Sequence, residues 1–304
     1  QIFISVFAAM LVFHSFLSFE QLAGKFLSLQ NNQQQAELTD VIEDEAFFPR
    51  VNGKFLFANQ LALFCFWAWL VLAYAFLKGE RSWQLWVSGG LLIFNLLFSQ
   101  SRSVWLVMVG IGGMLFVRYY KQLIKLIRKQ LDSQLNGRSI LLVLFGGVAV
   151  LAVLIPRVIA TTYSLDEEGG SADIRLQMIQ EGFSVFRQLP FIGYGANTNV
   201  IIMGREFPDG YITSFPFAIH FGYLQMGLES GLFGVFFFFF PLFMLLRKSL
   251  KALIKNIELE KLFQFSFAAG TLIYYLFQPY TGRVELPLLG CFFLIFAMID
   301  FESL

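Results

Sequence analysis

Long apolar runs recur along this chain and constrain its fold more than any other feature. Several exceed the roughly 18 residues that a helix needs to cross a bilayer. Charged residues make up 14% of the 304 residues, whereas soluble domains carry about 25%. Because backbone groups in lipid must pair within their own segment, each run is expected to be a helix. We therefore predict an all-α, polytopic membrane helical bundle.

Eight membrane spans are expected in this sequence. Their approximate bounds are 1–19, 56–77, 83–100, 103–120, 139–155, 219–246, 262–279 and 286–302. Because Gln1 begins inside an apolar stretch without the features of a signal peptide, we expect further spans before it. We predict a single membrane domain over 1–304, with an outer-loop subdomain over 156–218.

The distribution of charge predicts which loops are cytoplasmic. If the loop at 78–82 is cytoplasmic, loops on its side hold thirteen of the 22 basic residues and six of the 21 acidic ones. Lys and Arg are enriched in short cytoplasmic loops. The segments 20–55 and 156–218 are therefore expected on the outer side. The net charge of +1 gives no indication of a nucleic-acid partner.

The outer loop 156–218 is longer than a simple connection and is expected to be functional. A short amphipathic helix capped by Ser171 is predicted over about 172–188. Its apolar side can lie on the membrane surface. The helix is expected to end before a turn that contains Pro190, Gly193 and Gly195.

Three cationic or protonatable side chains fall on the predicted outer face. Arg102 lies in a tight turn between Ser101 and Ser103, Arg175 begins the loop helix, and His220 opens the next span. An ionisable group this close to hydrocarbon is costly and is a functional candidate. Arginine can bind phosphate through two parallel hydrogen bonds, and imidazole, with a pKa of about 6.5, can accept a hydroxyl proton. We predict an anion site at this face.

Each of these side chains also has a structural interpretation. Arg102 can reach lipid headgroups, Arg175 can pair with a nearby acidic residue, and His220 can be an ordinary interface residue. Glu229 is expected on the His220 side of the span and inside the bundle, where a buried hydrogen bond would fix the helix. Close helix packing is expected at the glycines of this span, which are Gly222, Gly227, Gly231 and Gly234.

At these residues the chain resembles the bacterial O-antigen ligase and polymerase family of membrane glycosyltransferases. Four segments match the family's motifs in order, over roughly residues 50–245. They are Arg50–Gly53 with Ala58–Ala62; Ser101–Arg102; Arg175 with Pro190 and Gly193–Gly195; and His220 with Tyr223–Leu224, Glu229, Gly231 and Gly234. Phe221 stands where the family usually has asparagine.

The resemblance implies a GT-C-like bundle that moves a glycan from undecaprenyl pyrophosphate to an acceptor sugar hydroxyl. The reaction would take place at the outer face of the bacterial inner membrane. Expected partners are the lipid-linked donor, a lipid A–core or lipid-linked glycan acceptor, and membrane lipids. The resemblance further implies an inverting transfer that needs no metal and no cofactor.

Residue roles combine this resemblance with the chemistry of the side chains. Arg102 and Arg175 are predicted to hold the pyrophosphate as its negative charge develops. His220 is predicted either to accept the hydroxyl proton or to bind phosphate as a cation. Further substrate-binding residues are expected to be Ser101, Ser103, Tyr223 and Arg205, and supporting residues to be Glu229, Gly193, Gly195 and Asn59.

Other functions stay open at this stage. Ligase and polymerase share the donor and differ in the acceptor, which the sequence does not identify. A transporter or flippase of polar or lipid-linked solutes would place polar residues near mid-membrane on paired broken helices. The central spans are mostly apolar, with Asn95 and Gln264 as mild exceptions. A structural or assembly protein would tolerate replacement of all three cations.

Overall fold

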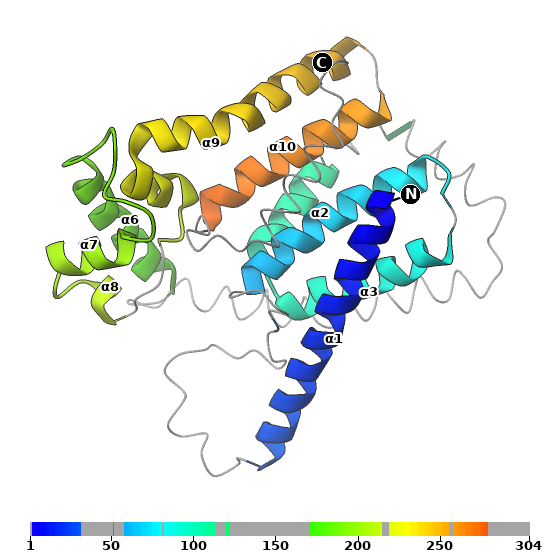
Figure 1. Ribbon diagram of the computed structural model, residues 1–304, viewed down its shortest axis with the longest axis horizontal. Coiled ribbons are helices and arrows are strands. Elements are labelled where there is room, and N and C mark those ends of the chain that lie inside the picture. Colours follow the sequence, from blue (N-terminus) through cyan, green and yellow to red (C-terminus); the bar gives the residue numbers. More distant parts are fainter. Residues whose placement is uncertain are drawn as a thin grey trace.

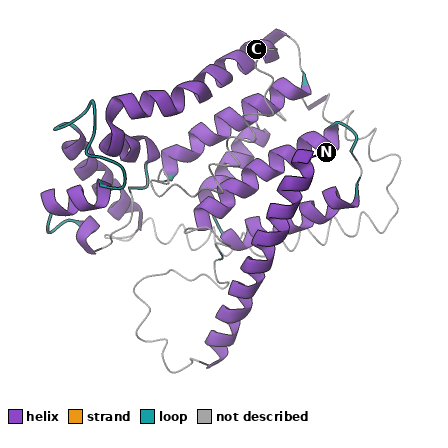
Figure 2. Cartoon of the chain, viewed as in Figure 1, coloured by secondary structure: helices purple, strands orange, loops and turns teal. Residues whose placement is uncertain are grey.

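The computed structural model describes residues 2–31, 51, 58–80, 82–113, 120–121, 171–214, 219–255 and 258–278. Regular structure in these ranges is entirely helical (Figure 2). Three of the described helices are long and apolar enough to cross a membrane. The prediction of an all-α membrane protein is therefore confirmed.

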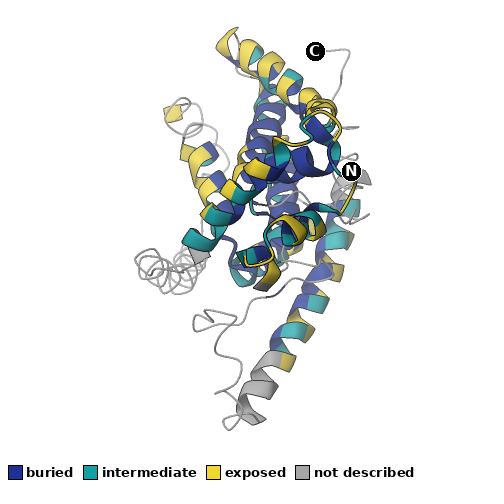
Figure 3. Cartoon of the chain, turned by 90° about the vertical axis from the view of Figure 1, so that its left-hand side faces the viewer, coloured by how far each residue is buried: buried dark blue, intermediate teal, exposed yellow. Residues whose placement is uncertain are grey.

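Mostly apolar helices of different lengths form the membrane bundle (Figure 1). They are α1 (Ile2–Asn31), α2 (Ala58–Leu77), α3 (Trp83–Ser99), the helix Arg102–Gly113, part of α9 (Gly222–Lys255) and α10 (Leu259–Phe277). Helix α2 is central: 72% of its apolar stretch is buried within the protein, against 33% in α1 and α9. Helices α3 and α10 pack against α2, and exposed positions on the outer helices are left for lipid (Figure 3).

Most of the expected spans correspond to described helices, with different ends. The spans expected over 139–155 and 286–302 lie outside the described residues. Helix α1 continues to Asn31, twelve residues beyond the expected end of the first span. The segment 20–31 contains good helix formers and no proline, so the helix continues as a more polar extension.

Buried polar contacts join the helices within the bundle. Asn95 of α3 donates to the hydroxyl of Ser15 and accepts from Ser18, both on α1. Trp67 of α2 donates its indole N–H to Thr271 of α10 at 3.0 Å. Hydrogen bonds of this kind contribute about 0.6–2 kcal/mol each to helix association in lipid. Asn95, a polar residue in the otherwise apolar span 83–100, thus serves helix packing.

Three shorter helices gather at one end of the molecule (Figure 1). They are α6 (Ser171–Phe186), α7 (Asn199–Glu206) and α8 (Tyr211–Ser214). They share a buried apolar cluster with the first turns of α9, formed by Met178, Val185, Met203, Ile212, Ile219, Leu224 and Leu228. The apolar side of α6 that was expected to lie on the membrane is therefore largely buried against protein. The sequence predicted α6 but neither α7 nor α8.

Helix α9 folds back on itself at Gly231. The backbone of Gly231 is not helical, with φ 65° and ψ −172°. The rings of Tyr223 and Phe239 lie 4.2 Å apart between centroids, although sixteen residues of straight helix would separate them by about 24 Å. The straight span expected over 219–246 is thus two arms, Gly222–Ser230 and Leu232–Lys255.

The loop Pro190–Gly195, here called the docked loop, follows α6. It supplies hydrogen-bond partners for the backbone groups that the break in α9 leaves unpaired. Two carbonyl groups of the first arm accept from loop amides, and two amides of the second arm donate to loop carbonyls. These bonds are Tyr194 N to Leu228 O (2.7 Å), Gly195 N to Glu229 O (2.8 Å), Leu232 N to Pro190 O (2.8 Å) and Phe233 N to Phe191 O (3.4 Å). In an unbroken helix the same two carbonyls and two amides would pair with each other.

Two glycines permit this close contact. Gly193 and Gly231 have φ of +66° and +65°, where L side chains are strained. A Cβ atom on Gly231 would lie 2.1 Å from the carbonyl oxygen of Phe191, and one on Gly193 would lie 2.6 Å from the backbone of α9. Both obstructions are backbone atoms, so a side chain cannot be accommodated by a rotamer change.

We expect Gly231→Ala to lower the thermal unfolding temperature of the purified protein in detergent. Positive φ alone costs on the order of 1–3 kcal/mol, and the clash with the loop adds to it. Gly90→Ala is the control, because a Cβ on this glycine of α3 meets nothing within 4 Å and alanine favours helix. Equal unfolding temperatures for Gly231→Ala and the wild type would contradict the close contact between this loop and the break in α9.

Candidate functional site

A two-residue turn presents Ser101 and Arg102 at one end of the bundle. Gln100 closes α3 in the left-handed conformation (φ 49°), with its N–H bonded to Leu97 O. The side chain of Ser101 is 1% exposed, and its Oγ has no hydrogen-bond partner among the described residues. An unpaired buried hydroxyl costs about 1–3 kcal/mol. The following helix begins at Arg102, and the positive end of its dipole favours an anion at the same place.

A chain of side-chain hydrogen bonds fixes the position of this turn. Asn59 of α2 donates to Gln278 Oε1 at 2.6 Å, and Gln278 Nε2 donates to Ser103 Oγ. Tyr274 of α10 donates its hydroxyl to the carbonyl of Asn59 at 3.0 Å. The start of α2, the end of α10 and the start of the helix Arg102–Gly113 are thereby joined. A supporting role was expected for Asn59, whereas no local sequence pattern indicated Gln278.

His220 is brought to the same end of the bundle. It lies two residues before α9 and is partly exposed. Tyr223, three residues later, donates its hydroxyl to the carbonyl of Leu272 at 2.9 Å. Leu272 is less than two turns before Gln278, the residue that contacts Ser103. The hydroxyl of Tyr223, which was expected to bind substrate, joins α9 to α10 here.

Helix α6 places Arg175 on the face that contacts the segment around His220. Gly182 lies so close to Ile219 that a Cβ would be 2.8 Å from its Cδ1 atom. The ring centroid of Phe183, the residue after Gly182, lies 6.3 Å from that of Phe221. Arg175 precedes Gly182 by seven residues, or about 10 Å, which returns to the same helix face. Both neighbours of His220 thus contact the helix that carries Arg175.

Glu229 is buried where α7 meets the first arm of α9. It accepts hydrogen bonds from the amides of Asn199 and, at 3.2 Å, Gln225. The carbonyl oxygens of both amides are buried without a hydrogen-bond partner among the described residues. The carboxylate therefore holds α7 beside the break, through buried hydrogen bonds to α7 and to its own helix. Gln225 was detectable from its i, i+4 spacing, whereas Asn199 gave no local signal.

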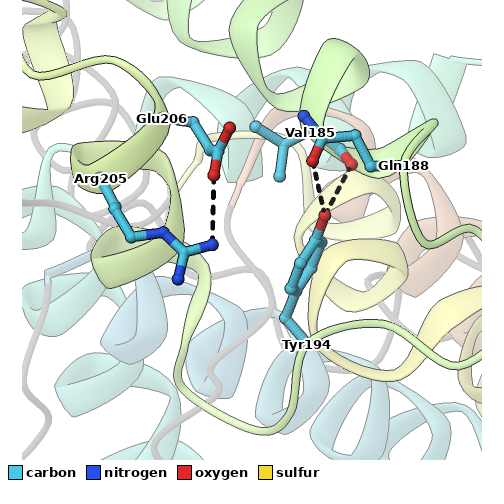
Figure 4. Close-up of polar contacts among 5 residues, drawn as sticks. All are labelled: Val185, Gln188, Tyr194, Arg205 and Glu206. Atoms are coloured by element: carbon cyan, nitrogen blue, oxygen red, sulfur yellow. Dashed lines mark hydrogen bonds and ion pairs between the residues drawn. The ribbon is translucent and has the colours of Figure 1, made fainter.

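The hydroxyl of Tyr194 attaches the docked loop to the end of α6 (Figure 4). It lies 3.2 Å from Gln188 Oε1 and 3.4 Å from the carbonyl of Val185, between which it donates its single hydrogen. The loop that completes α9 is therefore also tied to the helix that carries Arg175.

Arg205 has a different environment from the other predicted site residues. It lies on the last turn of α7 and forms an ion pair with its neighbour Glu206 at 3.2 Å (Figure 4). Its side chain is mostly exposed. The described contacts give it no link to the three predicted catalytic side chains, so its expected role in substrate binding stays a prediction.

Glu181 of α6 is a partly buried carboxyl group on the outer helices. One of its oxygens has no hydrogen-bond partner among the described residues, and burial raises the pKa of the group. The neutral form is favoured by the fold. The protonated Glu181 therefore contributes to folding stability at pH values below the ordinary carboxyl pKa. This contribution is lost as the pH rises through the raised pKa of the folded state.

Comparison with known families identifies the chain. The family model described as O-antigen ligase matches residues 87–239, which is half of the sequence. The chain belongs to the O-antigen ligase family. No curated protein matches it. With its apolar helices, this O-antigen ligase family member is a glycan-transferring enzyme of the bacterial inner membrane.

The matched segment of the O-antigen ligase family runs from α3 into the second arm of α9. It includes the turn with Ser101 and Arg102, the helix with Arg175, the docked loop, and His220 with the first arm. Asn59 and Gln278 lie outside it. The structure therefore joins the family segment to the two helices that position its serine–arginine turn.

We expect Glu229→Ala and Glu229→Gln to differ clearly in stability. Alanine leaves the amides of Asn199 and Gln225 without an acceptor, at about 1–3 kcal/mol for each buried group. Glutamine keeps an acceptor and adds a donor for the unpaired amide oxygens, so its unfolding temperature should match or exceed that of the wild type. Thermal unfolding in detergent measures both. An equal loss in the two variants would show that the negative charge itself holds the contact.

Proposed function

We propose that this protein transfers a glycan from undecaprenyl pyrophosphate to a sugar hydroxyl on lipid A–core or on another lipid-linked glycan. The observation that carries the proposal is the serine–arginine turn. Ser101, whose buried hydroxyl has no hydrogen-bond partner among the described residues, is followed there by an arginine and by the first turn of a helix. A hydroxyl, a guanidinium group and a helix N-terminus all interact favourably with a phosphate oxygen. The bonds from Asn59 and Gln278 hold this arrangement in place before substrate binds.

The proposed chemistry needs positive charge on protein groups beside the leaving group. A pyrophosphate gains negative charge as the glycosidic bond breaks, and fixed donors in a site of low dielectric stabilise it. Arg102 and Arg175 supply that charge without a metal ion. His220 takes the proton of the acceptor hydroxyl, which then attacks the anomeric carbon from the opposite side and inverts it; alternatively, His220 binds phosphate as a cation.

The site is proposed to face the outer side of the membrane. The positive-inside rule supports this orientation. The basic residues Arg247, Lys248, Lys251 and Lys255 end the second arm of α9 shortly before α10 begins, whereas the serine–arginine turn contacts Gln278 at the far end of α10. Asn95 and Gln264, the polar residues that a transporter could use at mid-membrane, are engaged in hydrogen bonds within the protein. Asn95 bonds to serines of α1, and Gln264 donates to Glu260 on its own helix at 3.3 Å.

Ligase and polymerase activities are separated by the phenotype of a null strain. Loss of a polymerase leaves core capped with one repeat unit, whereas loss of a ligase leaves uncapped core and accumulates free lipid-linked polymer. Gel analysis of surface glycan distinguishes the two. Normal glycan in the null strain would contradict both activities.

We expect Arg102→Ala, Arg175→Ala and His220→Ala each to reduce glycan transfer by about 100- to 1,000-fold. This is the usual effect of removing one group that stabilises transition-state charge. Each variant is made in the full-length protein, and transfer is scored at matched membrane levels. Arg187→Ala is the matched control, because this arginine is exposed at the other end of α6. Normal transfer by all three variants would reject the site.

The pH dependence of transfer separates the two roles of His220. A general base must be neutral to act, so the rate should fall on the acid side as the imidazole becomes protonated. A phosphate-binding cation gives the opposite result, with activity lost on the basic side. The rate of glycan transfer is measured across the pH range with saturating donor. We expect the variant His220→Gln to lose one limb of the pH–rate profile. Loss of the acid limb identifies His220 as a general base, and loss of the basic limb identifies it as a phosphate-binding cation.

Ser101→Ala and Ser103→Ala test whether the unpaired hydroxyl serves a ligand. Ser101→Ala removes a buried hydroxyl that makes no hydrogen bond to the described part of the chain, so the unfolding temperature should be unchanged or higher while transfer falls. Ser103→Ala removes the acceptor of Gln278 and should lower the unfolding temperature. If Ser101→Ala retains full activity, the hydroxyl plays no part in binding the donor.

A further inference from the structure

The tip of the loop after α6 is apolar, exposed and rigidly held. The side chains of Phe191 and Ile192 are 60% and 66% exposed. The residues on either side are fixed to α9, because Pro190 and Phe191 accept backbone hydrogen bonds and Gly193 packs against the backbone at the break. Two large apolar side chains are thus presented outward on a loop whose backbone is fixed.

The loop tip continues a lipid-facing stripe on the second arm of α9. Exposed phenylalanines recur there at spacings of three and four residues, which places them along one side of the helix. They are Phe233, Phe236, Phe237, Phe240 and Phe243. The ring of Phe191 lies 6.3 Å from that of Phe233, the outermost member of the stripe. The surface of the loop tip is therefore continuous with the surface that faces lipid.

The length of the second arm places its first residues at membrane depth. From Leu232 to Leu250, just before Lys251, the arm has nineteen residues and spans about 28 Å. The hydrocarbon core is about 30 Å thick. If the arm crosses the core, Leu232 and Phe233 must lie at or within its outer boundary, even when Arg247 and Lys248 extend to the opposite surface. The neighbouring ring of Phe191, with its centroid 6.3 Å from that of Phe233, lies within that distance of the same depth.

We propose that Phe191 and Ile192 insert into the acyl chains of the outer leaflet, making the segment Leu189–Gly195 a re-entrant membrane anchor. Non-helical backbone is tolerated at this depth only where protein satisfies its polar groups. The four bonds between the loop and α9 meet this requirement on both sides of the break. The anchor holds α6 and α7 against the membrane surface, and it does not depend on the reaction that the protein catalyses.

The test measures the environment of a fluorescent probe at the loop tip. Cys65 and Cys291 are replaced by alanine, and an NBD fluorophore is attached to Ile192→Cys in the full-length protein in phosphatidylcholine liposomes. Asp209→Cys, exposed between α7 and α8, is the water-facing control. Phe237→Cys, on the exposed stripe of α9, is the lipid-facing control.

At residue 192 we expect emission shifted to the blue relative to residue 209. We also expect at least twofold stronger quenching by lipid with a doxyl group near the headgroup, and protection from iodide in water. Iodide quenching equal to that at residue 209 would overturn the anchor. Protection from both iodide and doxyl lipid would also overturn it, because a second copy or another protein would then cover the tip.

Discussion

The exchange of backbone hydrogen bonds at Gly231 is the interaction on which the outer part of this protein depends. A break in a membrane helix leaves carbonyl and amide groups unpaired, and in lipid each such group costs several kcal/mol. The loop from Pro190 to Gly195 pairs with both sides of the break. Neither segment would be stable alone at this depth, so each determines the conformation of the other.

This exchange also determines where the candidate site residues lie. Because α9 folds back, its first arm is packed between the outer helices and the bundle, with Leu224 and Leu228 in the outer cluster and Met226 in the bundle core. His220 precedes this arm and is carried to the end of α10. The same loop is tied through Tyr194 to the end of α6, so the break, the loop and the helix of Arg175 form one connected unit.

The chemistry proposed for the O-antigen ligase family member requires an anion site at the edge of the membrane. We propose that the bundle supplies it at a turn whose position is set by polar contacts from two other helices, through Asn59 and Gln278. Ser101 precedes Arg102 there, and its buried hydroxyl has no hydrogen-bond partner among the described residues. A site prepared in this way needs little reorganisation when charge develops on a leaving group.

Several features of the site were accessible from the sequence because they have local causes. Apolar runs predict helices, Pro190 predicts the end of α6, and cations beside apolar spans are unusual enough to indicate function. The family resemblance added the order of the motifs. Asn199 and Gln278 were missed because an isolated amide at the end of a helix is common, and its partner lies 30 or 175 residues away.

The sequence by itself determined the helical membrane character of this protein, since that follows from the lengths of its apolar runs and the cost of unpaired backbone in lipid. Only the tertiary structure decided that the span containing Glu229 is folded in two. Gly231 permits either a straight or a broken helix, and the choice depends on a loop about forty residues earlier that replaces the lost hydrogen bonds. Such a choice rests on long-range pairing, which local sequence patterns do not specify.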